Sequence, residues 1–372
     1  MMSSPLVAPF TEALHAYTKD LAILSGQGTK IIGYFCTYTP VEIIHAAGFL
    51  PVRILGGTGQ VNGAYALAPN FICPPLLLSL EKALEGRFNF LSGVVQAYTC
   101  DVACGMVNIW EENIGGEIHH TIPLPYNDAP GGRVFYRSVL EEFTERLIRM
   151  GGDITEESLR ASIALYTDIR GMILELYGLR HRGHLPLSAA DVHAVIQAGF
   201  VIPPEKYRSM LMRLLKEMKQ VGHDYPIGVP LLVSGSLVEE PKVLSILEQS
   251  GGRIVADDLC TGYRHFYPPA GEGADALDRI LDRYMRRFPC PARTRAIQRV
   301  PLLMELMRDS GARGIVFLFQ KFCTPHLSDY PIIREELARE GVPNMAIELE
   351  ATGIMEGQLE TRFQAFIEML EG

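Results

Sequence analysis

The chain has 372 residues, of which 48% are apolar and 21% charged, so it has the composition of an ordinary globular protein and the length for two domains with separate cores. Its net charge of −9 argues against a nucleic-acid-binding surface and against a polybasic membrane patch. Because no apolar run reaches the length of a membrane span and no signal segment is recognisable, we expect a cytoplasmic protein with neither nucleic acid nor membrane as a partner.

A helical lead-in over residues 1–29 is followed by a predicted α/β domain over residues 30–133. Lys30–Phe35 is predicted to be a buried strand, Cys36 lies in the turn after it, and a helix is expected to begin at Pro40, where a missing N–H costs nothing. The remaining predicted elements of this domain are, in order, a strand over 50–55, a helix from Pro74 or Pro75, a strand over 90–97, a helix through Trp110 and a strand over 117–123.

Residues 134–222 are almost wholly helical in pattern and are predicted to join and cover two sheets. Glycine and proline separate four expected helices, over 135–150, 155–177, 188–198 and 205–218. Ser188 is the predicted N-cap of the third, with Asp191 three residues on in a near capping box. We find no catalytic motif in this segment.

Strands return in residues 223–372, which we predict to be a second α/β domain. A strand over 227–233 ends in Ser234-Gly235-Ser236, and further strands are expected over 253–256, 314–318 and 344–349, with a last helix over 358–370. The order strand, turn, helix, glycine, strand repeats the order found from residue 30, which indicates an internal duplication by pattern. The predicted fold is therefore α/β: two similar parallel-sheet domains, Rossmann- or flavodoxin-like, facing a cleft and joined by a helical segment.

Seven widely spread cysteines favour thiols or metal ligands over disulfides. Cys36, Cys100 and Cys323 each lie just past the end of a predicted strand, the side of an open α/β sheet where ligands bind. Thiolates suit iron–sulfur clusters or zinc, although catalytic zinc sites usually include histidine and no His-x-x-x-His motif occurs. The alternative is that these cysteines are small buried apolar residues, as free cysteines usually are.

Several motifs occur in order along the chain: Gly33-Tyr-Phe-Cys36-Thr-Tyr-Thr-Pro40-x-Glu42, Tyr98-Thr-Cys100-Asp101, Asp257-Asp258-Leu-Cys260-Thr-Gly262-x-Arg264, Gln320-Lys-Phe-Cys323 and Gly357-Gln-Leu-Glu-Thr361-Arg362. Together they resemble the 2-hydroxyacyl-CoA dehydratase family, which includes the related benzoyl-CoA reductase subunits. The resemblance implies a heterodimer in which each subunit holds a [4Fe–4S] cluster by three cysteines, and Cys36, Cys100 and Cys323 match that ligand pattern. It also implies a separate ATP-dependent iron–sulfur activator that injects one electron.

The reaction implied by the resemblance is elimination of water from an (R)-2-hydroxyacyl-CoA to an enoyl-CoA through a ketyl radical, as in anaerobic amino-acid fermentation. A length of 372 residues favours the shorter subunit of this family. Two alternatives stay open: a subunit of a benzoyl-CoA-reductase-like or double-cubane-type ATP-dependent reductase, and a non-catalytic electron-relay subunit.

Four cysteines remain: Cys73, Cys104, Cys260 and Cys290. Cys73, Cys260 and Cys290 resemble some ligand positions of double-cubane homologues, but no second cysteine follows shortly after Cys73. We therefore favour a single cubane and interpret all four as buried filler.

Glu42, six residues after Cys36, is the candidate catalytic side chain, and the alternative is a solvated carboxylate in the first turn of a helix. His45 is interpreted as a satisfied helix histidine. Asp257, Asp258 and Arg264 are expected either at the mouth of the cleft or in a surface salt bridge.

Overall fold

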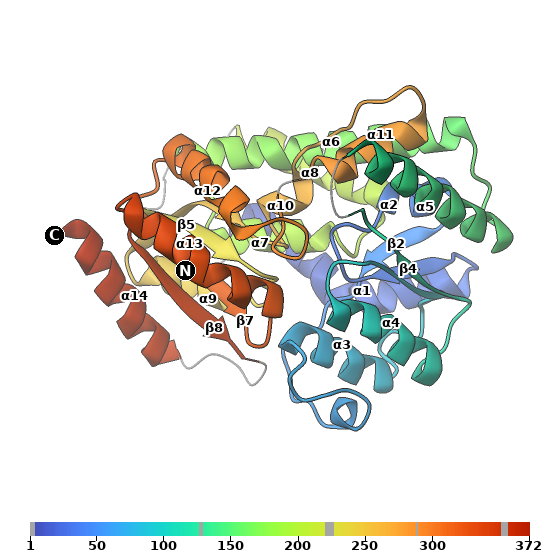
Figure 1. Ribbon diagram of the computed structural model, residues 1–372, viewed down its shortest axis with the longest axis horizontal. Coiled ribbons are helices and arrows are strands. Elements are labelled where there is room, and N and C mark those ends of the chain that lie inside the picture. Colours follow the sequence, from blue (N-terminus) through green and yellow to red (C-terminus); the bar gives the residue numbers. More distant parts are fainter. Residues whose placement is uncertain (1–3, 126–128, 220–226, 288, 351–355) are drawn as a thin grey trace.

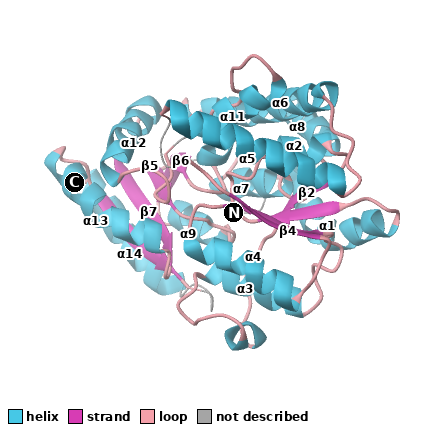
Figure 2. Ribbon diagram, turned by 45° about the vertical axis from the view of Figure 1, so that its right-hand side comes forward, coloured by secondary structure: helices cyan, strands magenta, loops and turns pink. Residues whose placement is uncertain are grey.

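The computed structural model describes residues 4–125, 129–219, 227–287, 289–350 and 356–372, in which the strands form two four-stranded parallel sheets flanked by helices (Figures 1 and 2). The first sheet has the order β2-β1-β3-β4, formed by β1 (Ile31–Tyr34), β2 (Leu50–Arg53), β3 (Gly93–Ala97) and β4 (Ile118–Ile122). The second has the matching order β6-β5-β7-β8, formed by β5 (Val229–Gly235), β6 (Gly252–Asp258), β7 (Gly314–Gln320) and β8 (Asn344–Leu349). The predicted pair of parallel sheets is confirmed.

Helices cover both faces of each sheet, and the inner strands β1, β3 and β7 are therefore buried along their whole length. The edge strands β4 and β8 carry polar residues and are only partly buried. In β1, Ile31 contributes to one hydrophobic cluster and Ile32 to another, because successive side chains of a strand point to opposite faces. Leu231 and Leu232 of β5 divide between two clusters in the same way. The helices that pack against the second sheet are α9 (Lys242–Gln249) and α14 (Glu356–Glu371) on one face, and α12 (Ala296–Ser310) and α13 (Thr324–Arg339) on the other.

The first sheet carries α1 (Ala8–Gly26), α3 (Pro74–Leu84), α4 (Asp101–Asn113), α7 (Ala189–Ala198) and α8 (Pro204–Met218) on one face. On its other face lie α2 (Val41–Ala46), α5 (Pro130–Arg149) and α11 (Ala276–Met285). The short helical elements are η1 (Pro5–Val7), η2 (Gly63–Ala66) and α10 (Tyr263–Phe266). Thus α11, which follows β6 in the chain, packs with the first sheet, so the two sheets are not covered by separate stretches of sequence.

The long helix α6 (Glu156–His181), green along the top of Figure 1, contacts both halves of the molecule. Its Arg170 forms a buried ion pair with Glu42 of α2, and its Arg180, ten residues on, forms another with Asp257 of β6. This agrees with the role expected for the segment 134–222, although its predicted boundary at 222/223 lies outside the described residues.

Two local predictions can be compared directly. Ser188 caps α7 and Asp191 returns the hydrogen bond, so the capping box is confirmed. The helix expected from Pro40 begins instead at Val41, because Pro40 has a ψ of 81°, which is outside the helical region. No helix among the described residues is long and apolar enough to cross a membrane.

Candidate functional site

Cys36, Cys100 and Cys323 all lie beyond the carboxyl ends of parallel strands, as the sequence predicts. Cys36 follows β1, whereas Cys100 and Cys323 follow β3 and β7 and are the N-cap residues of α4 and α13. All three side chains are half-buried. The first two belong to one sheet and the third to the other, so a site made by all three would be shared between the halves.

A backbone N–H shortly after each cysteine lowers the pKa of its thiol: that of Tyr38, Ala103 or His326, for Cys36, Cys100 and Cys323 in turn. The Thr99 hydroxyl also donates to Cys36 Sγ at 3.4 Å. N–H groups at a turn or a helix start favour a negative charge at this position. The local backbone is therefore suited to a thiolate.

Electrostatic contacts link the thiols from the two sheets. Cys100 interacts with Cys36 and with Cys323, while Cys260 also interacts with both Cys36 and Cys323. Cys73 interacts with Cys100 and Cys323, and Cys104 interacts with Cys100 and Cys36. The structure thus gathers cysteines that are as far apart in the sequence as residues 36 and 323, and their role as metal ligands stays a prediction.

Burial raises the pKa of each of the Cys36, Cys100 and Cys323 thiols, and it outweighs the hydrogen bonds that lower it. A bound metal would replace the thiol proton and offset that penalty. Within the described ranges, no group of three or more His, Cys, Asp or Glu side chains is placed to hold a single metal ion.

The four other cysteines are placed less uniformly than the filler interpretation implies. Cys290 is buried, but Cys73, Cys104 and Cys260 are half-buried. Cys290 interacts electrostatically with Cys260 and Cys36, so it too lies near the thiol group. One sequence signal pointed to Cys73: it directly precedes a helix, as Cys100 and Cys323 do.

Glu42 is not a solvated carboxylate, so that interpretation is wrong. Its side chain is buried, accepts a hydrogen bond from Arg170 at 2.5 Å and another from the Tyr284 hydroxyl at 2.9 Å. Burial raises its pKa, but the opposing charges of Arg170 and Arg283 are together stronger and lower the pKa to about 2. A carboxylate with this pKa is a poor proton acceptor near neutral pH, and its proposed catalytic role stays a prediction.

His45 is satisfied as expected, with hydrogen bonds to Ser162 and Glu205. The two interpretations of Asp257, Asp258 and Arg264 are both wrong, because all three side chains are buried. The strand β6 continues two residues further than predicted and carries both aspartates inside the protein. There Asp258 pairs with Arg264 and Arg299, and the charge of each buried group is compensated.

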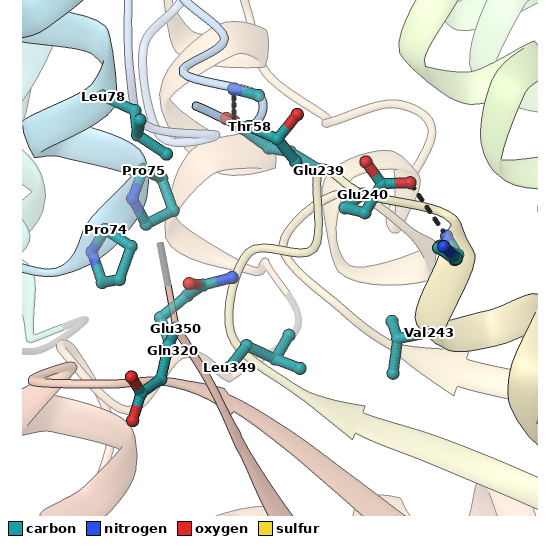
Figure 3. A pocket seen from close by; sticks show the side chains of 12 residues that line it. Thr58, Pro74, Pro75, Leu78, Glu239, Glu240, Val243, Gln320, Leu349 and Glu350 are labelled. Carbon is teal, nitrogen blue, oxygen red and sulfur yellow. Dashed lines mark hydrogen bonds between the residues drawn. The ribbon is translucent and has the colours of Figure 1, made fainter. Parts of the chain in front are cut away.

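A cavity of about 280 Å³ lies between the two halves, and its lining includes Pro74, the residue after Cys73, and Gln320, three residues before Cys323 (Figure 3). Pro74, Pro75 and Leu78 of α3 line one side, and Gln320, Leu349 and Glu350 line the other. Glu239, in the second half, accepts a hydrogen bond from the N–H of Gly57, in the first half, at 2.5 Å. Burial raises the pKa of Glu239 to about 7. Sequence reasoning missed Glu239, which lies in a loop without a recognisable motif.

The sequence is similar to one protein-family model and to several known proteins over most of its length. The family model described as "2-hydroxyglutaryl-CoA dehydratase, D-component" matches residues 36–370. A benzoyl-CoA reductase subunit from Thauera aromatica is 29% identical over 84% of this chain and 84% of its own length. "(R)-phenyllactyl-CoA dehydratase beta subunit" from Clostridium sporogenes is 26% identical over 92% of both chains, and "Lactoyl-CoA dehydratase subunit beta" from Anaerotignum propionicum is 28% identical over 94% of both.

Proposed function

The chain belongs to the 2-hydroxyglutaryl-CoA dehydratase D-component family, and from this premise we propose that it is the shorter, iron–sulfur subunit of a 2-hydroxyacyl-CoA dehydratase. The observation that carries the proposal is the position of Cys36, Cys100 and Cys323 beyond three strand ends of two matching sheets. Because relatives are named as beta subunits, the proposal includes a second dehydratase subunit as partner.

The proposed cofactor is a [4Fe–4S] cluster held by the thiolates of Cys36, Cys100 and Cys323. The donor set fits this cofactor, since thiolates are the usual ligands of such clusters and a backbone N–H already lowers the pKa of each thiol. When bound, a three-thiolate cluster supplies one-electron transfer and one iron open to a further ligand. The chain's own contribution is to bury the thiols and restrict access of water.

The proposed reaction is radical elimination of water from an (R)-2-hydroxyacyl-CoA, started by one electron from an ATP-dependent activator. The specific observation favouring a second candidate, a subunit of a benzoyl-CoA-reductase-like enzyme, is the similarity to the Thauera aromatica benzoyl-CoA reductase chain. The two differ in stoichiometry: dehydration needs ATP and an electron only to start, whereas net reduction consumes both in every turnover.

The test begins with iron and acid-labile sulfide in protein purified anaerobically with the chain that co-purifies with it. We expect about four of each per chain; about eight would indicate a double cubane, and zinc in place of iron would overturn the proposal. Activator, ATP and a 2-hydroxyacyl-CoA are then added. Enoyl-CoA formation with many turnovers per ATP supports the dehydratase, while ATP use proportional to turnover supports the reductase. Cluster signals that do not change on adding acyl-CoA would identify an electron-relay subunit.

A further inference from the structure

A second and larger cavity, of about 570 Å³, shares no lining residue with the cavity in Figure 3. Its position is given by Tyr38, which lines it and interacts electrostatically with Cys36 and Cys290. Its lining residues come from distant parts of the sequence, with Tyr136 of α5 joined by residues from the ranges 284–287 and 291–298. This volume is within the range of pockets that bind small molecules.

The charge of this cavity is one-sided. Its lining includes Arg287, Arg293 and Arg295, and no carboxylate is found among the described residues that line it. Arg287 is held in place by hydrogen bonds to Thr37 and to the carbonyl oxygen of Arg264. Arg295 is exposed at the edge and has no ion pair among the described residues. The cavity therefore concentrates positive charge on a protein whose net charge is −9.

Two buried polar groups of the lining have no hydrogen-bond partner in the described part of the chain: the hydroxyl of Tyr136, a residue 1% exposed, and Nε of Arg287, a residue 6% exposed. Arg283, which interacts electrostatically with Arg287, leaves its Nε and one terminal nitrogen unpaired as well. Such groups are costly to bury without an acceptor. All of them can donate, so the missing partner is an acceptor.

We infer that this cavity binds an organic oxyanion, whose phosphate or carboxylate group accepts from Arg287 and Tyr136 while Arg293 and Arg295 attract it from solvent. Guanidinium groups form strong hydrogen bonds with either oxyanion. The Arg287 guanidinium lies over the rings of Tyr38 and Tyr284, 5.0 and 5.6 Å from their centroids, and these contacts help to hold it at the cavity wall. The inference rests on the lining residues alone and holds whichever reaction the thiol group supports.

The test measures binding of two probes, inorganic pyrophosphate and phenylacetate, to the full chain as purified, by isothermal titration calorimetry. We expect saturable binding of at least one probe to the unmodified chain. Pyrophosphate alone would identify a phosphate ligand and phenylacetate alone a carboxylate. Tyr136→Phe should weaken that binding roughly tenfold, the effect of losing a hydrogen bond to a charged acceptor. The double variant Arg293→Gln/Arg295→Gln should weaken it roughly a hundredfold.

Two controls keep the result interpretable. Arg308→Gln removes an exposed arginine of the same helix region, about 20 Å from Arg295 along α12, and should leave binding unchanged. Tyr136→Phe deletes a hydroxyl that has no protein partner in the described part of the chain, so its melting temperature should match that of the unmodified chain. A lower melting temperature, absence of saturable binding of both probes, or equal binding by all variants would overturn the inference.

Discussion

The two sheets have the same strand order, yet the chain leaves their corresponding strands β1 and β5 in different ways. After β1 a turn carries the half-buried Cys36. After β5 the chain folds tightly onto β7: Ser236 Oγ accepts a hydrogen bond from the Gln320 N–H at 2.8 Å, and a Cβ on Gly235 would lie 1.9 Å from the Leu318 carbonyl oxygen. A duplicated architecture provides four equivalent strand ends, and here one of them serves packing instead of carrying a thiol.

The largest expected effect tests the three strand ends that do carry thiols. Cys36→Ser, Cys100→Ser and Cys323→Ser should each abolish iron and sulfide binding, because a hydroxyl is a poor replacement for a thiolate ligand. Iron and sulfide analysis and the visible absorption of anaerobic protein measure the loss. Cys104→Ser, which changes a half-buried cysteine one turn into α4, is the matched control and should keep the cluster. Retention of iron in all three variants would refute the ligand assignment.

The difference between the strand ends after β1 and β5 can also be tested by moving the thiol from the first to the second. Adding Ser236→Cys to Cys36→Ser should not restore iron, because the Ser236 side chain lies against the backbone of β7, bonded to the Gln320 N–H. Iron content of the double variant equal to that of the unmodified chain would mean that the two strand ends are interchangeable, and would contradict this account of their difference.

The second sheet depends on a buried carboxylate more heavily than the first. Asp258 is fully buried and pairs with Arg264 and Arg299, which are also buried. Asp258→Asn would leave the buried Arg264 without a carboxylate partner and Arg299 with Asp329 alone, and should lower the free energy of unfolding by about 3–5 kcal/mol in urea titrations. Glu335→Gln, in an exposed pair with Arg339, is the control and should change stability little. Similar losses in both variants would show that Asp258 has no special structural role.

The sequence was sufficient to predict the structural features that depend on residues close together in the chain. Periodicity identified both sheets and the helices between them, and the capping box at Ser188 was recognisable from four residues. The cysteines at strand ends followed from the same local pattern. The sequence alone could not show that Glu42 is buried, because its partner Arg170 is 128 residues away in the chain. The arginine-rich cavity was missed for the same reason, since Tyr136 and residues from the ranges 284–287 and 291–298 meet only in the folded chain.

In the first half of the molecule, α2 is joined to α6 by the ion pair between Glu42 and Arg170. A substitution of Glu42 tests how much this attachment contributes to stability. The pKa of Glu42 is about 2 in the folded chain, below the ordinary value of 4.5, so the ionised form stabilises the fold. This contribution is complete above about pH 4.5 and is lost as the pH falls towards 2. Glu42→Gln should therefore cost about 3 kcal/mol at pH 7 and progressively less in acid. Urea titrations between pH 2 and 7 measure it, and a pH-independent difference would contradict the assignment.

The smallest expected effect concerns Glu239, which follows the tight turn after β5 and links the two halves through Gly57. Its pKa is raised to about 7 by burial, so the fold favours the protonated form and loses stability as the pH rises from about 4.5 through 7. Glu239→Gln keeps an acceptor for the Gly57 N–H but carries no charge. It should equal the unmodified chain below about pH 4.5 and exceed its stability by about 2 kcal/mol at pH 8. If the variant is less stable at pH 8, the ionised carboxylate stabilises the junction, and the closed strand end after β5 then has an electrostatic as well as a packing role.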